Sequence, residues 1–263
     1  MDADGSALAN LLKEISWEGK RTLLYRDGGR GLENVLTVEV FQALDFLPRK
    51  EFLARVFRSA VGGSPDTLQT LAEDIEKLSV RLLPGNVDLA EGPPNGKEVL
   101  HVQPDGILES SRVYCMLEAK RIKRGAFNRE QLAREFLAVL KHARCRSALL
   151  FLVLPSPPPV LVKEHGRLSL YDAIDSCLDH VRERSDGEFP PADELRSKVD
   201  SLVAYTTWER VSEEIEEGLK EFSHADGSVR GCVGRLAQAA LGAIKRHGSE
   251  RRRPDPLSLG HAV

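Results

Sequence analysis

Two short polar motifs near the middle of the chain combine residue types that can hold a cation. Pro104-Asp105 is followed, after twelve further residues, by Glu118-Ala119-Lys120. Glu118 and Lys120 are two positions apart in an apolar stretch, so on a β-strand their side chains project from the same face. If that strand forms a hairpin with the segment before it, Asp105 lies beside Glu118. We therefore expect two carboxylates and an ammonium group to meet at the end of this strand.

Such a cluster has a definite chemical requirement. Two neighbouring carboxylates are costly to bury without a cation, and a divalent metal removes that cost. Mg²⁺ prefers oxygen ligands and keeps several of its waters, so two carboxylates and a backbone carbonyl make a suitable open site. The candidate ligands are Asp105, Glu118 and the carbonyl of Ala119.

The segment around and after the second motif is strongly basic. Residues 118–146 contain nine Lys or Arg and three acidic residues, a local charge of +6 in a chain whose net charge is −3. Positive charge gathered in one segment suits a surface that binds phosphates, and a solvated helix face is the other explanation of a charge run. Four residues close behind the candidate site are expected to contact a nucleic-acid backbone: Arg121, Lys123, Arg124 and Arg129.

The elements expected around these motifs are two strands, a helix and a further strand. Residues 107–108 and 113–120 predict a hairpin, with its turn at Ser110 and Ser111. Residues 131–142 have the spacing of an amphipathic helix, and the apolar run 147–154 predicts a buried strand. A helix between two strands indicates a crossover connection, so these two strands are expected to be parallel.

The rest of the chain predicts mainly helices, with a few short strands. Helices are expected at 6–16, 33–47, 50–60, 67–78, 168–184, 208–222 and 229–246, and strands at 99–102 and 201–207. This order predicts an α/β protein with three α/β/α layers and a central mixed sheet. The length of 263 residues and the content of 41% hydrophobic and 29% charged residues fit one globular unit. We expect a single domain over residues 1–248 and a disordered tail at 249–263.

The paired motifs resemble those of the PD-(D/E)XK nuclease superfamily, the fold of restriction endonucleases and archaeal Holliday junction resolvases. The resemblance covers about residues 30–154 and implies a restriction endonuclease-like core with added helices. It implies a nuclease that depends on Mg²⁺, with Mn²⁺ as a substitute, and hydrolyses phosphodiester bonds of nucleic acid, with DNA as the expected partner. Asp105 and Glu118 would hold the metal, and Lys120 would orient or deprotonate the attacking water.

The resemblance also suggests two further site residues. Members of the superfamily commonly place a Glu on the first core helix, and Glu33 follows a glycine-rich turn at the start of that helix. Glu39 is the competing candidate; it lies about 120° away around the helix, so both cannot face one ion. Gln131 matches a polar residue that many relatives carry on the helix after the catalytic strand, whereas Glu135 stands where some exonuclease subfamilies place Tyr.

A non-enzymatic function remains the alternative. The superfamily includes inactive members, so the chain could be a catalytically inactive DNA-binding or assembly module on the nuclease fold. That alternative predicts loss of the acidic residues, and this sequence retains them. A third reading, an acid-rich interaction protein with no nucleic-acid partner, would require the rest of the fold to neutralise the basic segment.

The remaining sequence features indicate no membrane partner and no zinc site. No apolar run reaches the roughly 18 residues that span a bilayer, and the N-terminus lacks the pattern of a signal peptide, so we expect a cytoplasmic protein. The four cysteines are too widely spaced for a zinc signature and are expected to be reduced and mostly buried. His101 and His142 are expected to have no role in the chemistry.

Overall fold

The computed structural model describes residues 31–89, 100–123, 125–185 and 189–249, with side chains from Asn34 onward. Its centre is a six-stranded mixed sheet, in the order β1-β10-β7-β6-β5-β2. The strands are β1 (Val61–Gly62), β2 (Ser79–Leu82), β5 (Gly106–Glu109), β6 (Val113–Ala119), β7 (Ser147–Leu154) and β10 (Val203–Thr207). β6, β7 and β10 are parallel, and the other three strands pair antiparallel.

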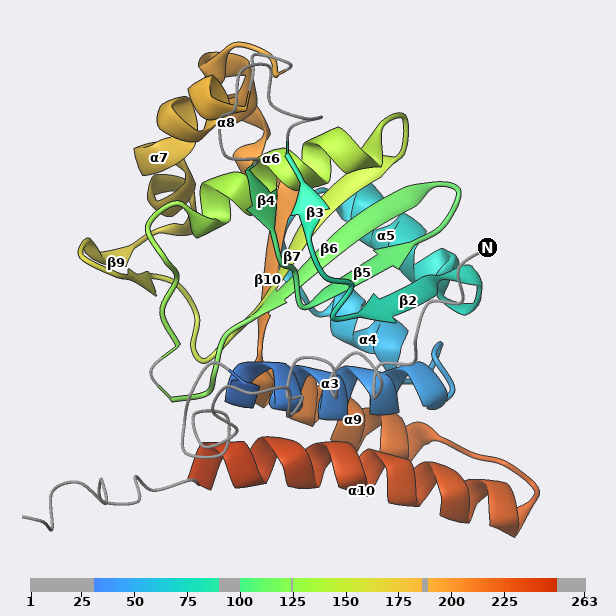
Figure 1. Cartoon of the computed structure of the whole chain (residues 1–263). Coiled ribbons are helices and arrows are strands. Elements are labelled where there is room, and N and C mark those ends of the chain that lie inside the picture. Colours follow the sequence, from blue (N-terminus) through green and yellow to red (C-terminus); the bar gives the residue numbers. More distant parts are fainter. Residues whose placement is uncertain (1–30, 90–99, 124, 186–188, 250–263) are drawn as a thin grey trace, which may run out of the picture.

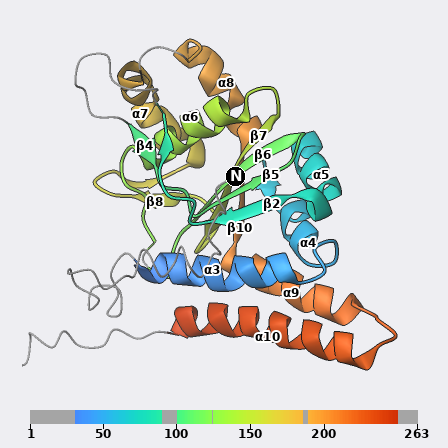
Figure 2. The ribbon, with the colours of Figure 1, turned by 45° about the vertical axis from the view of Figure 1, so that its right-hand side comes forward.

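Helices cover both faces of the sheet, as Figures 1 and 2 show. The helices on one face are α6 (Gln131–Ala143), α7 (Leu170–Arg184) and α8 (Ala192–Leu202). The helices on the other side are α3 (Gly31–Phe46), α4 (Leu53–Arg58), α5 (Pro65–Glu73), α9 (Trp208–Glu221) and α10 (Gly227–Ser249). α10 packs on α3 and α9 and lies outermost. The expected three-layer α/β/α fold with a central mixed sheet is confirmed.

The alternation of side chains along β6 explains how the layers are built. Cys115 and Leu117 contribute to the hydrophobic cluster with α3, whereas Tyr114 and Met116 contribute to the cluster with α6. Every residue of β6 is buried because helices cover both faces of this central strand. Glu118 and Lys120 continue the α6-facing series, so the period of two brings their polar groups to the same side.

Several elements appear where the sequence predicted them. The hairpin of β5 and β6, the helix α6 and the strand β7 all agree within a few residues, and Ser110 N donates to Val113 O across the expected turn. The parallel pairing of β6 with β7 confirms the crossover through α6. The helices after residue 168 and the strand ending at Thr207 are also present.

Other expectations were wrong or incomplete. β4 (His101–Val102) pairs with β3 (Val87–Asp88) in a separate two-stranded sheet, so the strand expected at 99–102 does not join the hairpin. The helix expected at 50–60 is reduced to Leu53–Arg58, and that at 67–78 ends at Glu73 before a 3₁₀ turn. The sequence also missed six helices and strands, which are β1, β2, β3, α8 and the hairpin of β8 (Val160–Val162) and β9 (Gly166–Leu168).

The missed elements share weak patterns. β2 has four residues at the sheet edge, and only Leu82 is fully buried there. α8 buries only Leu195 and Val199 and is otherwise polar, so its apolar period is short. Short edge strands and polar helices carry little hydrophobic signal because few of their side chains enter the core.

The remaining expectations have mixed outcomes. All four cysteines are free thiols, but only Cys115 and Cys177 are buried; Cys145 and Cys232 are exposed. Within the described residues, no helix is long and apolar enough to cross a membrane. The helix expected at 6–16 and all but the first residue of the expected tail lie outside the described residues.

Candidate metal and nucleic-acid site

The register of the β5–β6 hairpin brings the two motifs together. Gly106 pairs with Leu117, so one step further along the ladder places Asp105 opposite Glu118. Asp105, Glu118 and Lys120 are only 5%, 3% and 4% exposed. The sequence expectation that these three residues meet at the end of β6 is therefore realised in the structure.

Short hydrogen bonds hold the two carboxylates. The backbone N–H of Ala119 donates to Asp105 Oδ2 at 2.8 Å, across the end of the hairpin. Glu118 Oε1 accepts from Lys120 Nζ at 2.6 Å and from Gln131 Nε2, also at 2.6 Å. Gln131 lies in the first turn of α6, so its hydrogen bond to Glu118 links this helix to the end of β6.

Lys120 is fixed by its backbone as well as by its side chain. Its N–H donates to Val153 O at 2.8 Å, and its carbonyl accepts from Trp208 Nε1 at 2.7 Å. Its Nζ lies 4.8 Å from the ring centroid of Phe127, within the range of a cation–π interaction. A side chain at Gly125 would approach Lys120 Cβ to 2.8 Å, so the loop after β6 needs glycine there.

A third buried acid lies on α6 and was not expected at the site. Glu135 is 1% exposed and follows Gln131 by one helical turn, and its Oε1 accepts from Gln131 Nε2 at 2.8 Å. Burial raises the pKa of Glu135 well above its ordinary value, and the nearby Glu118 carboxylate raises it further. A sequence signal existed, since an acid within the apolar stripe of an amphipathic helix is unusual.

These groups line one cleft of about 870 Å³. Asp105, Glu118, Lys120, Gln131 and Glu135 all contribute to its wall. The cleft opens beyond the carboxyl ends of β6 and β7, the edge of a parallel sheet where ligands bind in open α/β folds.

Basic residues from separate segments line the same cleft: Arg121, Arg129, Arg134 and Lys163. Arg134 is paired with Glu130, and Lys163 Nζ donates to Asn128 Oδ1 at 2.7 Å. Lys163 belongs to the β8–β9 hairpin and was not predicted, because that hairpin itself was missed.

The other expected nucleic-acid contacts are not placed in the cleft. Lys123 is exposed and is not among the lining residues, and Arg124 lies outside the described residues. His101, which was expected to have no role, lines the cleft, whereas His142 contacts the carbonyl of Asp88 at 2.9 Å.

The two candidates for an acid on the first helix have different outcomes. Glu33 lies in the first turn of α3, and its side chain is outside the described residues, so that expectation stays a prediction. Glu39 instead faces α10, where its carboxylate accepts from Arg246 at 2.8 Å and lies 3.2 Å from His247. The His247 contact is the main cause that lowers the pKa of Glu39. Among the described side chains of α3, that of Asn34 lines the cleft.

The donor set fits a hard divalent cation in its chemistry. Three buried carboxylates, those of Asp105, Glu118 and Glu135, line the cleft, and Glu135 Oε2 is buried without a hydrogen-bond partner among the described residues. Oxygen ligands of this kind are those that Mg²⁺ prefers. Within the same described residues, however, no three acidic, His or Cys side chains are close enough together to hold an ion directly.

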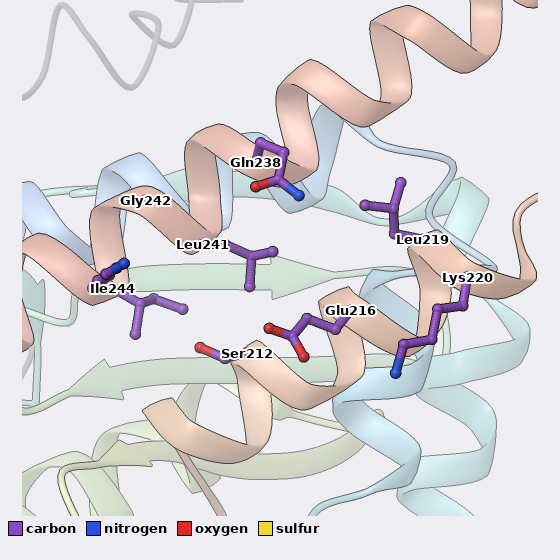
Figure 3. A pocket seen from close by; sticks show the side chains of 9 residues that line it. Ser212, Glu216, Leu219, Lys220, Gln238, Leu241, Gly242 and Ile244 are labelled. Carbon is purple, nitrogen blue, oxygen red and sulfur yellow. The ribbon is translucent and has the colours of Figure 1, made fainter.

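A second hollow, of about 600 Å³, lies between α9 and α10. Figure 3 shows Leu241 and Ile244 of α10 pointing toward α9, where Ser212 and Glu216 lie. Glu216 is the one acid among its lining residues. It therefore lacks the paired carboxylates that distinguish the cleft beside β6.

Comparisons with protein-family models, with curated proteins and with solved structures give no match to this chain.

Proposed function

We propose that this chain is a nuclease of the PD-(D/E)XK type, which hydrolyses nucleic-acid phosphodiester bonds with the help of Mg²⁺ or Mn²⁺ and acts on DNA. The observation that carries the proposal is the burial of Asp105, Glu118 and Lys120 side by side in the wall of one cleft. Buried charged groups are expensive for a fold to maintain, and they cluster where a protein performs chemistry.

The acids and the amide would prepare the site for substrate. Asp105 and Glu118, with the carbonyl of Ala119, are the groups proposed to hold the cation. When bound, Mg²⁺ would lower the pKa of a water molecule that it coordinates and would neutralise charge that develops on the phosphate. Gln131 keeps the Glu118 carboxylate in place through its 2.6 Å hydrogen bond.

Lys120 is proposed to act on the attacking water and on the charge of the transition state. Its ammonium is already aligned by Glu118 Oε1 at 2.6 Å and by the Phe127 ring. A compact ammonium can orient a water molecule and stabilise a developing oxyanion without reorganisation.

The basic lining residues are proposed to bind the nucleic-acid backbone. Arg121, Arg129 and Lys163 surround the buried acids from the β6–α6 loop and from the β8–β9 hairpin. Phosphate contacts of this kind position a substrate without reading its sequence.

A nuclease assay with matched variants tests the proposal. Purified protein is incubated with plasmid, single-stranded DNA and RNA in Mg²⁺, in Mn²⁺ and in EDTA. We expect cleavage that requires the metal, a loss of at least about 100-fold in Glu118→Gln, and near wild-type cleavage in the control Glu39→Gln. Wild-type protein that binds DNA yet leaves it intact in both metals would instead support the inactive binding module.

A further inference from the structure

Glu135 is the most buried acid in the cleft, and the proposed hydrolysis does not use it. Its residue exposure of 1% is below the 5% of Asp105 and the 3% of Glu118. Such burial is unusual, because acidic side chains are almost never fully buried unless they are paired or hold a cation.

The charges buried around Glu135 are out of balance. Asp105, Glu118 and Glu135 are three acids, and Lys120 is the one base at least 95% buried among the cleft residues that the structure describes. Lys120 Nζ is paired with Glu118 at 2.6 Å. A bound divalent cation would compensate the excess of negative charge.

The geometry points to a third acidic member of the cation site. We propose, on the basis of the function proposed above, that Glu135 holds the divalent cation together with Asp105 and Glu118 by accepting a hydrogen bond from water bound to the ion. Glu135 is thus a positioning residue, which acts on the cation through that water.

Two observations favour this indirect role. Glu135 Oε2 is buried, lies in the cleft wall and has no hydrogen-bond partner among the described residues, so it can accept from a water molecule. The acids in the described part of the chain are not close enough to form a three-ligand group, which argues against direct coordination by all three. Mg²⁺ retains several waters, and outer groups that bind such waters help to hold the ion.

A second residue of α6, Gln131, links Glu135 to Glu118. Gln131 Nε2 donates both to Glu118 Oε1 and to Glu135 Oε1, so one amide group bridges the two carboxylates. Of the two acids on α3 that the sequence offered, Glu39 is engaged with α10, and the side chain of Glu33 lies outside the described residues.

The test measures metal binding without nucleic acid. Mn²⁺ is titrated into the full chain, and free Mn²⁺ is followed by its electron paramagnetic resonance signal, for wild type, Glu118→Gln, Glu135→Gln and the control Glu39→Gln. We expect Glu135→Gln to weaken Mn²⁺ binding by about 10- to 100-fold. Glu39→Gln should bind as wild type. Thermal melting without metal should show Glu135→Gln at least as stable as wild type, since glutamine keeps the acceptor for Gln131.

The outcomes separate this inference from the function on which it rests. Wild-type protein that fails to bind Mn²⁺ would overturn the cation-dependent function and the role of Glu135 with it. Binding that is lost in Glu118→Gln but unchanged in Glu135→Gln would overturn the role of Glu135 alone. Weakened binding in Glu135→Gln, with a melting temperature no lower than that of wild type, supports the inference.

Discussion

At the scale of single residues, the contact between Lys120 and Glu118 has the largest energetic consequence. Both side chains are at least 95% buried, and Lys120 Nζ lies 2.6 Å from Glu118 Oε1. A buried ion pair contributes little over an apolar pair, but removing one partner leaves a buried charge uncompensated. The loss of stability should be larger when Lys120 is removed than when Glu118 is removed, because Asp105 and Glu135, which also line the cleft, are acidic.

The asymmetry gives a stability prediction. Lys120→Met should lower the free energy of unfolding by about 3 to 5 kcal/mol, because it removes the positive charge from a group of acids. Glu118→Gln should leave it unchanged or raise it, because it removes one of those acids. Urea unfolding of both variants and of the double variant measures the effect. An equal decrease in the free energy of unfolding in the two single variants would contradict this account.

At the scale of elements, the β5–β6 hairpin is anchored at its turn, at the opposite end from the site. Asp74 accepts from Ser110 Oγ at 2.7 Å and from Arg112 Nη2 at 2.6 Å. The Arg112 hydrogen bond, followed by that of Ser110, lowers the pKa of Asp74 from 3.8 to about 2. The anchor fixes the hairpin on which Asp105 and Glu118 must align.

The lowered pKa of Asp74 predicts a pH-dependent stability. A depressed carboxyl pKa stabilises the fold above the unfolded pKa of about 4, and the contribution is lost as the pH falls through about 2. Asp74→Asn should therefore lower the melting temperature at pH 7, and its difference from wild type should shrink between pH 4 and 2.

The neighbouring acid provides a matched control. Glu73 also contacts Arg112, at 3.3 Å, but its side chain is 49% exposed. Exposed pairs contribute about 0 to 1 kcal/mol, so Glu73→Gln should change the melting temperature little. A shift as large in Glu73→Gln as in Asp74→Asn would show that the turn is not anchored through Asp74.

At the scale of the whole molecule, the fold divides the basic segment into two groups. Arg121, Arg129 and Arg134 line the cleft near the start of α6. Arg144 and Arg146 follow the end of that helix, about 20 Å away for 13 residues, and Arg146 is paired with Glu109. The excess charge of residues 118–146 is therefore not presented on one face.

This division predicts which charges govern DNA binding. Arg129→Glu should weaken DNA binding and reduce the slope of log affinity against log salt by about 1, because fewer counterions are released. Arg144 is exposed and belongs to the same segment, but it lies at the other end of α6. Arg144→Glu should therefore leave the slope unchanged. Fluorescence anisotropy with a labelled duplex between about 50 and 200 mM salt measures both. An equal change in the two variants would place the nucleic-acid surface elsewhere.

The sequence by itself determined the layers of the fold and the centre of the candidate site. Strongly patterned segments such as 113–120, 131–142 and 147–154 were predicted because they are buried, and burial imposes an apolar period on their residues. The meeting of Asp105 with Glu118 followed from local information alone, because a hairpin of fixed length and a side-chain period of two determine which residues are neighbours.

Only the tertiary structure decided the rest of the cleft. Glu135 joins it because α6 packs across β6, Lys163 because the β8–β9 hairpin lies alongside the loop at Phe127, and Glu39 is excluded because α10 covers that side of α3. Each of these contacts joins segments whose approach depends on packing between elements. A local pattern in the sequence specifies which face of an element is apolar, but it does not specify which other element will cover that face.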